Sequence, residues 1–334
     1  MPTPTTYPTS KQFLGLAKET VQGTAVTPST YWTPIDNFTP EDKPTWLDVK
    51  SMYNDMADTH GRVQGVMHTE FEAAFPLFMD GLPHLLYNIL GELSTAGTLP
   101  NVHSIDLLNS GTAQPPSHTF VHWQGLPATT QARVYAGACL SELTVSGNSE
   151  SSLLSVTCKG LAYPSSIYPT SAPVPTYSTV LPQAAWRYQI GLGGTVAGAP
   201  NAKIRDWSFT ITRELRAEWT AQNSQSPYII QRGKVSTSGA LTVAVPSDET
   251  EFLYLINNTQ PQMQIKGSVG AAGTLFGLQI DSQVTAMDTA RLKLDEEAIG
   301  YDVTWIGIAN TTNVGASGSY SPAKFVVSNQ TSSY

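Results

Sequence analysis

The sequence predicts a mainly β protein built from two tandem copies of one unit, each copy with a single flanking helix. Three observations carry this prediction. The chain has 334 residues, more than the roughly 250 to 300 at which a single hydrophobic core stops growing. Apolar and polar residues mostly alternate, which is the period of a strand with one buried face. Similar stretches also recur in the same order in both halves of the chain.

Low-complexity stretches divide the chain. They are rich in Pro, Ser and Thr and lie at the two ends and near the middle. The prolines of the middle stretch favour an extended connector over a packed element. The predicted segments are a flexible N-terminal arm at 1–10, a first repeat at 11–165, a Pro-rich linker at 166–183, a second repeat at 184–310 and a flexible C-terminal tail at 311–334.

Strand patterns and one helical pattern occur in each repeat. "SFTITREL" and "GALTVAV" alternate apolar and polar residues, and "LSELTVSG" and "LLSVTCKGLA" are typical of two strands joined by a Gly147-Asn148 turn. "GLPHLLYNILGEL" carries leucine and isoleucine at helical spacing, as expected for a helix that packs on a sheet. "ETEFLYLINN" predicts a shorter counterpart of that helix in the second repeat.

Ordered matches between the repeats indicate a duplication. "VTCKGLA" and "VTWIGIA" share Val, Thr, Gly and Ala at identical spacing, and the other matches keep the same order along the chain. The matched pairs are Ile35 with Ile204, Phe38 with Trp207, Tyr87 with Tyr254, and Val156 with Val303. Chance similarity between Thr- and Gly-rich strands is the alternative. If the duplication is real, Tyr87 superposes on Tyr254 and Val156 on Val303.

Net charge and the N-terminal sequence limit which partners and which cellular compartment we expect. Asp and Glu number 26 and Lys and Arg 18, for a formal net charge of −8. This balance argues against strong binding of duplex DNA, which depends on Lys and Arg. The start lacks the pattern of a secretion signal, and no apolar run reaches the roughly 18 residues of a membrane span. We therefore expect synthesis in the cytoplasm and no membrane span.

The two cysteines, Cys139 and Cys158, are too few for a disulfide scaffold. They flank the turn "SGNSESS", so a hairpin there would bring them near one another across two strands. In a reducing compartment, two buried thiols are the expected state.

Histidine spacing does not define a metal site. His118 and His122 share a face if their segment is a strand, but spacing places no third ligand beside them. Asp80 and His84 stand four residues apart, which on a helix indicates a surface pair.

The sequence contains no recognisable catalytic or cofactor motif. "GLGGTVAGAPNAK" lacks the Gly-Lys-Ser/Thr ending of a phosphate-binding loop. Glu70 and Glu72 could pass for paired carboxylates, yet two residues apart on a strand they more simply form a polar face. We therefore predict no enzyme, no metal and no cofactor.

Two stretches carry a family resemblance. "GLAKETVQGTAVTPSTYWTPIDNFTPEDKPTWLDVK" from Gly15, followed later by "GACLSELTVSGNSESSLLSVTCKG", resembles the major tail tube proteins of long-tailed, non-contractile phages, particularly those of actinobacterial hosts. The resemblance covers most of the first repeat and, through the duplication, the second. Its motifs are family-like phrases and not a chemical signature.

The resemblance implies a fold and an assembly. Each repeat would be a β-sandwich or partial barrel flanked by a helix, and three copies of a duplicated chain would supply the six domains of a ring. Rings would stack into a virion tail tube through which DNA passes without specific binding. The implied partners are further copies of the chain, the tape-measure protein, the tail terminator and tail-tip proteins.

Within that picture, alternation and loop length select candidate residues. Polar residues that alternate with apolar neighbours would face the lumen, namely Glu70, Glu72, Glu142, Thr144, Thr210 and Thr212. Long loops between paired strands, at 50–62 and 216–232, would become ordered only when rings stack. Their candidate residues are Tyr53, Asp55, Asp58, His60, Trp219 and Tyr228.

Two alternatives stay open at this stage. A baseplate or receptor-binding β-sandwich that recognises cell-surface glycan would expose clustered aromatic residues, for which Trp46, Trp123, Trp186 and Trp219 are available. A tube surrounded by a contractile sheath would leave the same sequence pattern.

Overall fold

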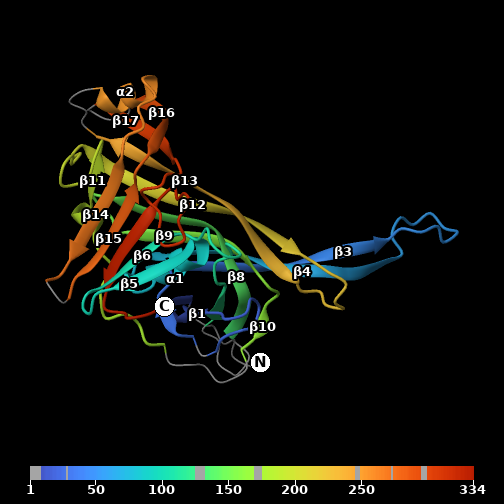
Figure 1. The fold of residues 1–334 in the computed structure, drawn as a ribbon. Coiled ribbons are helices and arrows are strands. Elements are labelled where there is room, and N and C mark those ends of the chain that lie inside the picture. Colours follow the sequence, from blue (N-terminus) through green and yellow to red (C-terminus); the bar gives the residue numbers. More distant parts are fainter. Residues whose placement is uncertain are drawn as a thin grey trace, which may run out of the picture.

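Long antiparallel strands dominate the structure (Figure 1). The computed structural model describes residues 9–27, 29–124, 132–168, 175–244, 249–271, 274–294 and 299–334. Within these ranges the helices are α1, Leu82–Ile89, and α2, Thr250–Ile256, with single 3-10 turns at η1, Thr9–Lys11, and η2, Ala185–Arg187. The prediction of a mainly β fold is confirmed.

The first half contains ten strands in the described residues. They are β1 Phe13–Lys18, β2 Tyr31–Thr33, β3 Asn37–Val49, β4 Gly61–Pro76, β5 Gly91–Ala96, β6 Asn101–Leu107, β7 His118–Trp123, β8 Ala132–Asn148, β9 Ser155–Ala162 and β10 Ser166–Ile167. The strands described in the second half are β11 Gln189–Leu192, β12 Ile204–Glu218, β13 Ile229–Val243, β14 Met263–Val269, β15 Phe276–Ser282, β16 Thr285–Lys293, β17 Gly300–Gly307 and β18 Lys324–Asn329.

One continuous sheet joins the two halves. Its strands lie in the order β3-β4-β9-β8-β12-β13-β17-β16, which we call the eight-stranded sheet. The order β3-β4-β9-β8 in the first half is repeated as β12-β13-β17-β16 in the second. The junction is the pairing of β8 with β12. This repeated order agrees with the predicted duplication, although superposition of the two halves stays a prediction.

A second sheet packs against one face of the first. Its order is β11-β14-β15-β18-β6-β5, and it also mixes strands of both halves. The long β8 additionally pairs, through its N-terminal part, with β7 and β10, and β7 continues into β1 and β2. Buried residues of both halves form one large hydrophobic cluster between the layers. The sheets form a sandwich and not a closed barrel, so the predicted two bodies share a core.

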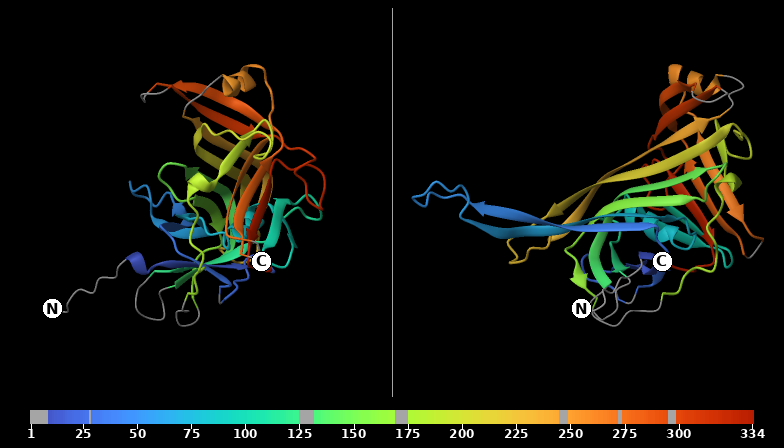
Figure 2. Two further views of the ribbon diagram at one scale, coloured as in Figure 1. Left: turned by 90° about the vertical axis from the view of Figure 1, so that its left-hand side faces the viewer. Right: turned by 180° about the vertical axis from the view of Figure 1, so that it is seen from behind.

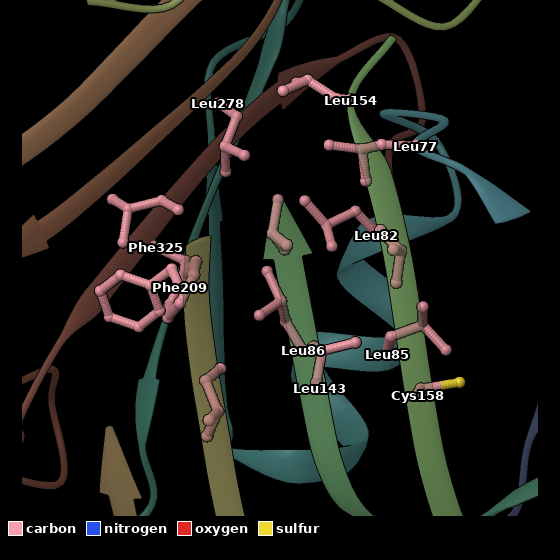
Figure 3. Packing of buried hydrophobic residues seen from close by; sticks show 14 of the residues in the cluster. Leu77, Leu82, Leu85, Leu86, Leu143, Leu154, Cys158, Phe209, Leu278 and Phe325 are labelled. Atoms are coloured by element: carbon pink, nitrogen blue, oxygen red, sulfur yellow. The ribbon is translucent and has the colours of Figure 1, made fainter. Parts of the chain in front are cut away.

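Helix α1 fills part of that core. Its leucines repeat at helical spacing, a proline occupies its first turn, and seven of its residues are buried. Figure 3 shows Leu82, Leu85 and Leu86 lying among the strands beside Leu143 and Cys158. The second predicted helix is present as α2, but it contacts the edge strand β16 and buries only Glu251 among its residues.

Strand pairing provides an alignment of the halves that does not use residue identity. The paired positions along this path are Val156 with Phe75, Val303 with Leu241, Ala73 with Phe38, and Gly239 with Phe209. If Val156 is set equivalent to Val303, then Phe38 becomes equivalent to Phe209, two residues beyond the Trp207 chosen by sequence. A shift of two residues keeps each side chain on the same face of the sheet, which is why the sequence pattern cannot resolve it.

We predicted a flexible C-terminal tail at 311–334, and this prediction is wrong for the residues that form strand β18. This strand pairs with β15 on one side and β6 on the other, and Phe325 and Val327 are completely buried. The alternating residues of "KFVVSN" explain why it folds, because one side of the strand is apolar. In the predicted linker, 166–183, the described residues also contact the first half: β10 pairs with β8, and Gln183 O accepts the backbone N–H of Leu154 at 2.9 Å.

The cysteines lie on neighbouring strands but not near one another. Cys158 is opposite Leu143, whereas Cys139 is opposite Leu161, so roughly 13 Å of strand separates the two positions. The predicted turn at Gly147-Asn148 begins after Asn148 instead, which shifts the register of the hairpin. Both thiols are free and buried as predicted, and burial raises the pKa of Cys158 to about 12.

Replacing a core residue of β18 tests whether this strand holds the two halves together. Phe325 packs edge-on against Phe209, with ring centroids 5.4 Å apart. Phe325→Ala should lower the free energy of unfolding by about 3–5 kcal/mol, because it leaves a cavity in a fully buried site. Urea unfolding is the measurement, and Tyr320→Ala, at an exposed position of the same segment, should change little. If both variants had equally small effects on the free energy of unfolding, the prediction of a flexible C-terminal tail would be right after all.

Candidate functional surfaces

The eight-stranded sheet has one covered face and one open face. Along β12, Phe209 and Ile211 are buried against the second layer, whereas Thr210 and Thr212 point to the other side. The same alternation runs through β4, β8 and β9. Directly paired residues of antiparallel strands share a face, so the alternation defines one polar surface, which we call the open face.

All six predicted lumen residues lie on the open face. Thr144 is opposite Thr210, and Glu142 is opposite both Thr212 and Lys159. The side chains interact: Thr144 Oγ1 and Thr210 Oγ1 are 2.8 Å apart, and Lys159 Nζ lies 3.0 Å from Glu142 Oε1. Sequence alternation therefore predicts correctly that these residues share one surface, and that this surface lines the lumen stays a prediction.

The first-half part of the open face is hollowed and acidic. A shallow depression of about 690 Å³ is lined by Glu41, Glu70, Glu72 and Lys159, among others. Two cations lie beside these carboxylates: Lys43, whose Nζ is 2.5 Å from Glu41 Oε2 and 3.9 Å from Glu70 Oε2, and Lys159, whose hydrogen bond to Glu142 raises its pKa. On the neighbouring strand β12, the open face carries the hydroxyl groups of Thr210 and Thr212. Such a face offers a phosphate backbone little attraction.

A long hairpin projects from the sandwich. Strands β3 and β4 stay paired as far as Val49 and Gly61, well beyond the body of the protein (Figure 2). We call residues 45–66 the hairpin arm. Its exposed apolar side chains are Trp46, Leu47, Met52, Tyr53, Met56 and Val63. An apolar projection with no covering layer is typical of an interaction surface.

The structure separates the predicted loop residues into two groups. Four lie at the tip of the hairpin arm, where Tyr53 and His60 have ring centroids 4.1 Å apart, His60 Nε2 lies 3.3 Å from Asp55 Oδ1, and Asp58 pairs with Lys50 at 2.8 Å. The other two, Trp219 and Tyr228, belong to the β12–β13 loop.

The β12–β13 loop packs at the base of the arm. Gln225 Nε2 donates to Gly65 O at 2.9 Å, and Met67 donates its backbone N–H to Gln225 O at 2.9 Å. Both predicted loops are shorter than expected, because β3 and β4 extend to 49 and 61, and β12 and β13 to 218 and 229. Whether either loop changes on assembly stays a prediction.

The eight-stranded sheet ends in two free edges. Within the described residues, β3 pairs with β4 alone and β16 pairs with β17 alone. Free edges of long strands are templates for pairing with another chain. At and near β16 lie exposed apolar side chains that the sequence reasoning missed, on α2, which contacts β16, and around the β16–β17 connection, namely Leu253, Ile256, Leu292, Leu294 and Ile299. The sequence of α2 contained a signal for these exposed side chains. "EFLYLI" has apolar residues all around the helix, more than one buried stripe can accommodate.

Four of the six histidines, His84, His103, His118 and His122, are buried. His118 Nδ1 lies 2.9 Å from Asn88 Nδ2, and burial lowers the pKa of His118 well below its usual value. Burial lowers the pKa of His122 to about 4. The predicted surface pair of Asp80 and His84 is wrong, since His84 is buried and Asp80 accepts a hydrogen bond from Ser178. No cluster of potential metal ligands occurs among the described residues.

Arg213 links the two halves of the chain, a role that the sequence analysis did not predict. From β12 it donates to Ile89 O, at the C-terminus of α1, at 2.6 Å and to Ala113 O at 3.0 Å. Burial, and then the neighbouring Arg232, lower its pKa to about 10. A cation at a helix C-terminus is favourable, so Arg213 ties the second half to the helix of the first.

The four tryptophans proposed for glycan recognition are dispersed. Trp46 lies on the hairpin arm, Trp219 at its base, Trp186 in η2, and Trp123 stacks on Phe13 at 5.9 Å. Two of them have cationic neighbours instead of aromatic ones, Arg62 on Trp46 and Arg187 on Trp186.

Comparison with known proteins supplies the family. None of the helices found in the described ranges is long and apolar enough to cross a membrane. No curated protein matches the chain. A family model described as phage tail tube protein matches residues 9–322. Because this match spans almost the entire chain, the protein belongs to the phage tail tube protein family and is a structural component of the virion tail.

Proposed function

We propose that three copies of the chain close into a ring, and that rings stack into the tail tube of a long, non-contractile-tailed phage. The single observation that carries the proposal is the repeated strand order in one eight-stranded sheet with two free edges. Inside the chain, the last strand of the first unit, β8, pairs with the first strand of the second, β12. Between copies, the corresponding strands are β16 and β3.

Ring closure removes both edges. Each chain supplies two four-stranded units, so three chains supply six, which matches the pseudo-sixfold ring expected from the family resemblance. Barrel diameter grows with strand number, and 16–18 strands already enclose a water channel. Three eight-stranded sheets would therefore enclose a wider bore.

The covered face decides which side lines the bore. The second sheet and α1 pack on one face of the eight-stranded sheet, and a closed barrel offers more room for a second layer on its outside than in its bore. The open face, with Glu70, Glu72 and Glu142, would then point inward. Phosphate groups would meet hydroxyls and carboxylates, so that DNA slides during ejection instead of being retained.

The hairpin arm is the proposed contact between stacked rings. It extends beyond the sandwich and exposes large apolar side chains that a neighbouring ring would cover. The ends of the tube would meet the tape-measure, terminator and tail-tip proteins. We further propose synthesis in the host cytoplasm before assembly, with no catalytic role and no cofactor.

Removing the apolar tip of the hairpin arm should block tube growth. Met52 and Met56 are fully exposed, so Met52→Ser with Met56→Ser costs the free chain little stability but removes buried contact area from a stacked tube. Negative-stain electron microscopy with particle mass should show long tubes for the unmodified chain and single rings for the variant. Leu181→Ser, at a strongly exposed apolar residue outside the hairpin arm, is the matched control. Long tubes from the double variant would exclude the tip as the stacking contact.

A positive charge on the open face should retard DNA. Thr212 is exposed on β12, so Thr212→Lys should leave tubes intact while placing a ring of cations in the bore. We expect ejection from phage carrying this variant to slow and to recover at higher salt, because phosphate contacts weaken with salt. Thr212→Glu is the control of equal exposure and opposite charge. Unchanged ejection kinetics in both variants would place the open face outside the bore.

A further inference from the structure

The internal junction of the two halves provides a template for the contact between copies. We propose that β16 of one copy pairs antiparallel with β3 of the next in a single register, with Thr289 opposite Thr39 and Ala290 opposite Phe38. This inference rests on the proposed ring and specifies how its copies join.

The register follows from equivalent positions in the two halves. Val145 pairs with Val156 as Ala290 pairs with Val303, and Thr144 pairs with Thr157 as Thr289 pairs with Thr304. On the other side of the junction, strand pairing makes Phe38 equivalent to Phe209. Inside the chain, Val145 lies opposite Phe209 and Thr144 opposite Thr210. Transferring these two pairs gives Ala290 opposite Phe38 and Thr289 opposite Thr39.

The faces of the two edge strands agree with this register. Phe38 is buried on the covered face, while Thr39 is exposed on the open face. Thr289 lies on the open face with Thr304, their hydroxyl oxygens 2.7 Å apart. A slip of one residue would place Thr289 opposite Phe38 and mismatch every side chain. Only even slips keep the faces matched.

A proline in β3 and a bulge in β16 distinguish the proposed register from those that differ by an even number of residues. In β4, the backbone N–H of Met67 points away from β3 to Gln225 O, and Ala74 O accepts the N–H of Asp36. Because peptide groups alternate along an antiparallel pair, Phe38 and Pro40 turn their peptide groups toward the free edge.

Pro40 therefore leaves the free edge without a donor at its position, as Pro44, opposite Met67, does four residues further along β3. In the proposed register Pro40 lies opposite Met287, next to Asp288, the extra residue of the irregularity between Met287 and Thr289. A proline is tolerated in a sheet where a bulge already interrupts the ladder of hydrogen bonds. Aligning Phe38 with Trp207 by sequence would instead place Thr289 opposite Glu41, and Pro40 within the regular part of β16.

Engineered cysteine pairs distinguish the registers. Chains carrying Thr39→Cys with Thr289→Cys are compared with Asn37→Cys/Thr289→Cys and Glu41→Cys/Thr289→Cys. Directly opposite Cβ atoms lie about 5 Å apart and diagonal ones about 7–8 Å. Assembled samples are oxidised with copper phenanthroline and resolved on non-reducing gels. The native Cys139 and Cys158 are buried, so the unmodified chain is the background control.

We expect the 39/289 pair to cross-link at least about tenfold faster than the other two pairs, giving linked species of two and three copies and none larger. Fastest linkage of the 41/289 pair would overturn this register while leaving the ring intact. Tubes that form without linkage in any variant would overturn the β3–β16 contact but not the tube. Absence of assemblies from the unmodified chain would instead overturn the proposed function, and the register with it.

Hydrogen exchange of the unmodified chain covers the case in which the cysteine variants fail to fold. Amide protons of β3 and β16 should become protected on assembly, because both strands gain ladder hydrogen bonds. Exchange that stays unchanged in either strand would overturn the inference.

Discussion

The pairing of β8 with β12 is the interaction on which the rest of the structure depends. It extends over seven residue pairs and fuses two four-stranded units into one sheet. The second sheet is joined in the same way, since β18 of the second half pairs with β6 of the first. Each half supplies strands to both sheets, and because both sheets run across the junction, the halves share one core. Arg213 reinforces the junction from within by binding the end of α1.

Two asymmetries of this sandwich have functional consequences. The eight-stranded sheet is covered on one face and open on the other, so in the proposed ring the covered face is the outer one. Its two edge strands are also long, and each is paired on one side only within the described chain, a feature that proteins acting alone usually avoid. The helices follow the same logic: α1, at the internal junction, is buried, whereas α2, at the free edge, leaves Leu253 and Ile256 exposed.

The sequence predicted the local features and missed the long-range ones. Alternation in "SFTITREL" placed Thr210 and Thr212 on the correct face because strand period is a local property. The spacing of leucines located α1 for the same reason. Strand β18 was missed because it lies in a Ser- and Gly-rich stretch and its partners are more than forty residues away along the chain.

The alternation of apolar and polar residues also could not predict the register between strands or the length of the strands. Phe38 could be aligned with Trp207 or Phe209 without changing a face, and only the partner strands distinguish these choices. The hairpin arm is longer than its predicted loop because β3 and β4 continue to pair through residues with no buried side.

The most direct test of this account is electron cryomicroscopy of tubes grown from the purified chain. The account predicts threefold rings in which three eight-stranded sheets form one continuous barrel, with the open face lining the bore and the second sheet outside. Tubes with a different number of copies in each ring, or with a covered face turned toward the bore, would contradict it.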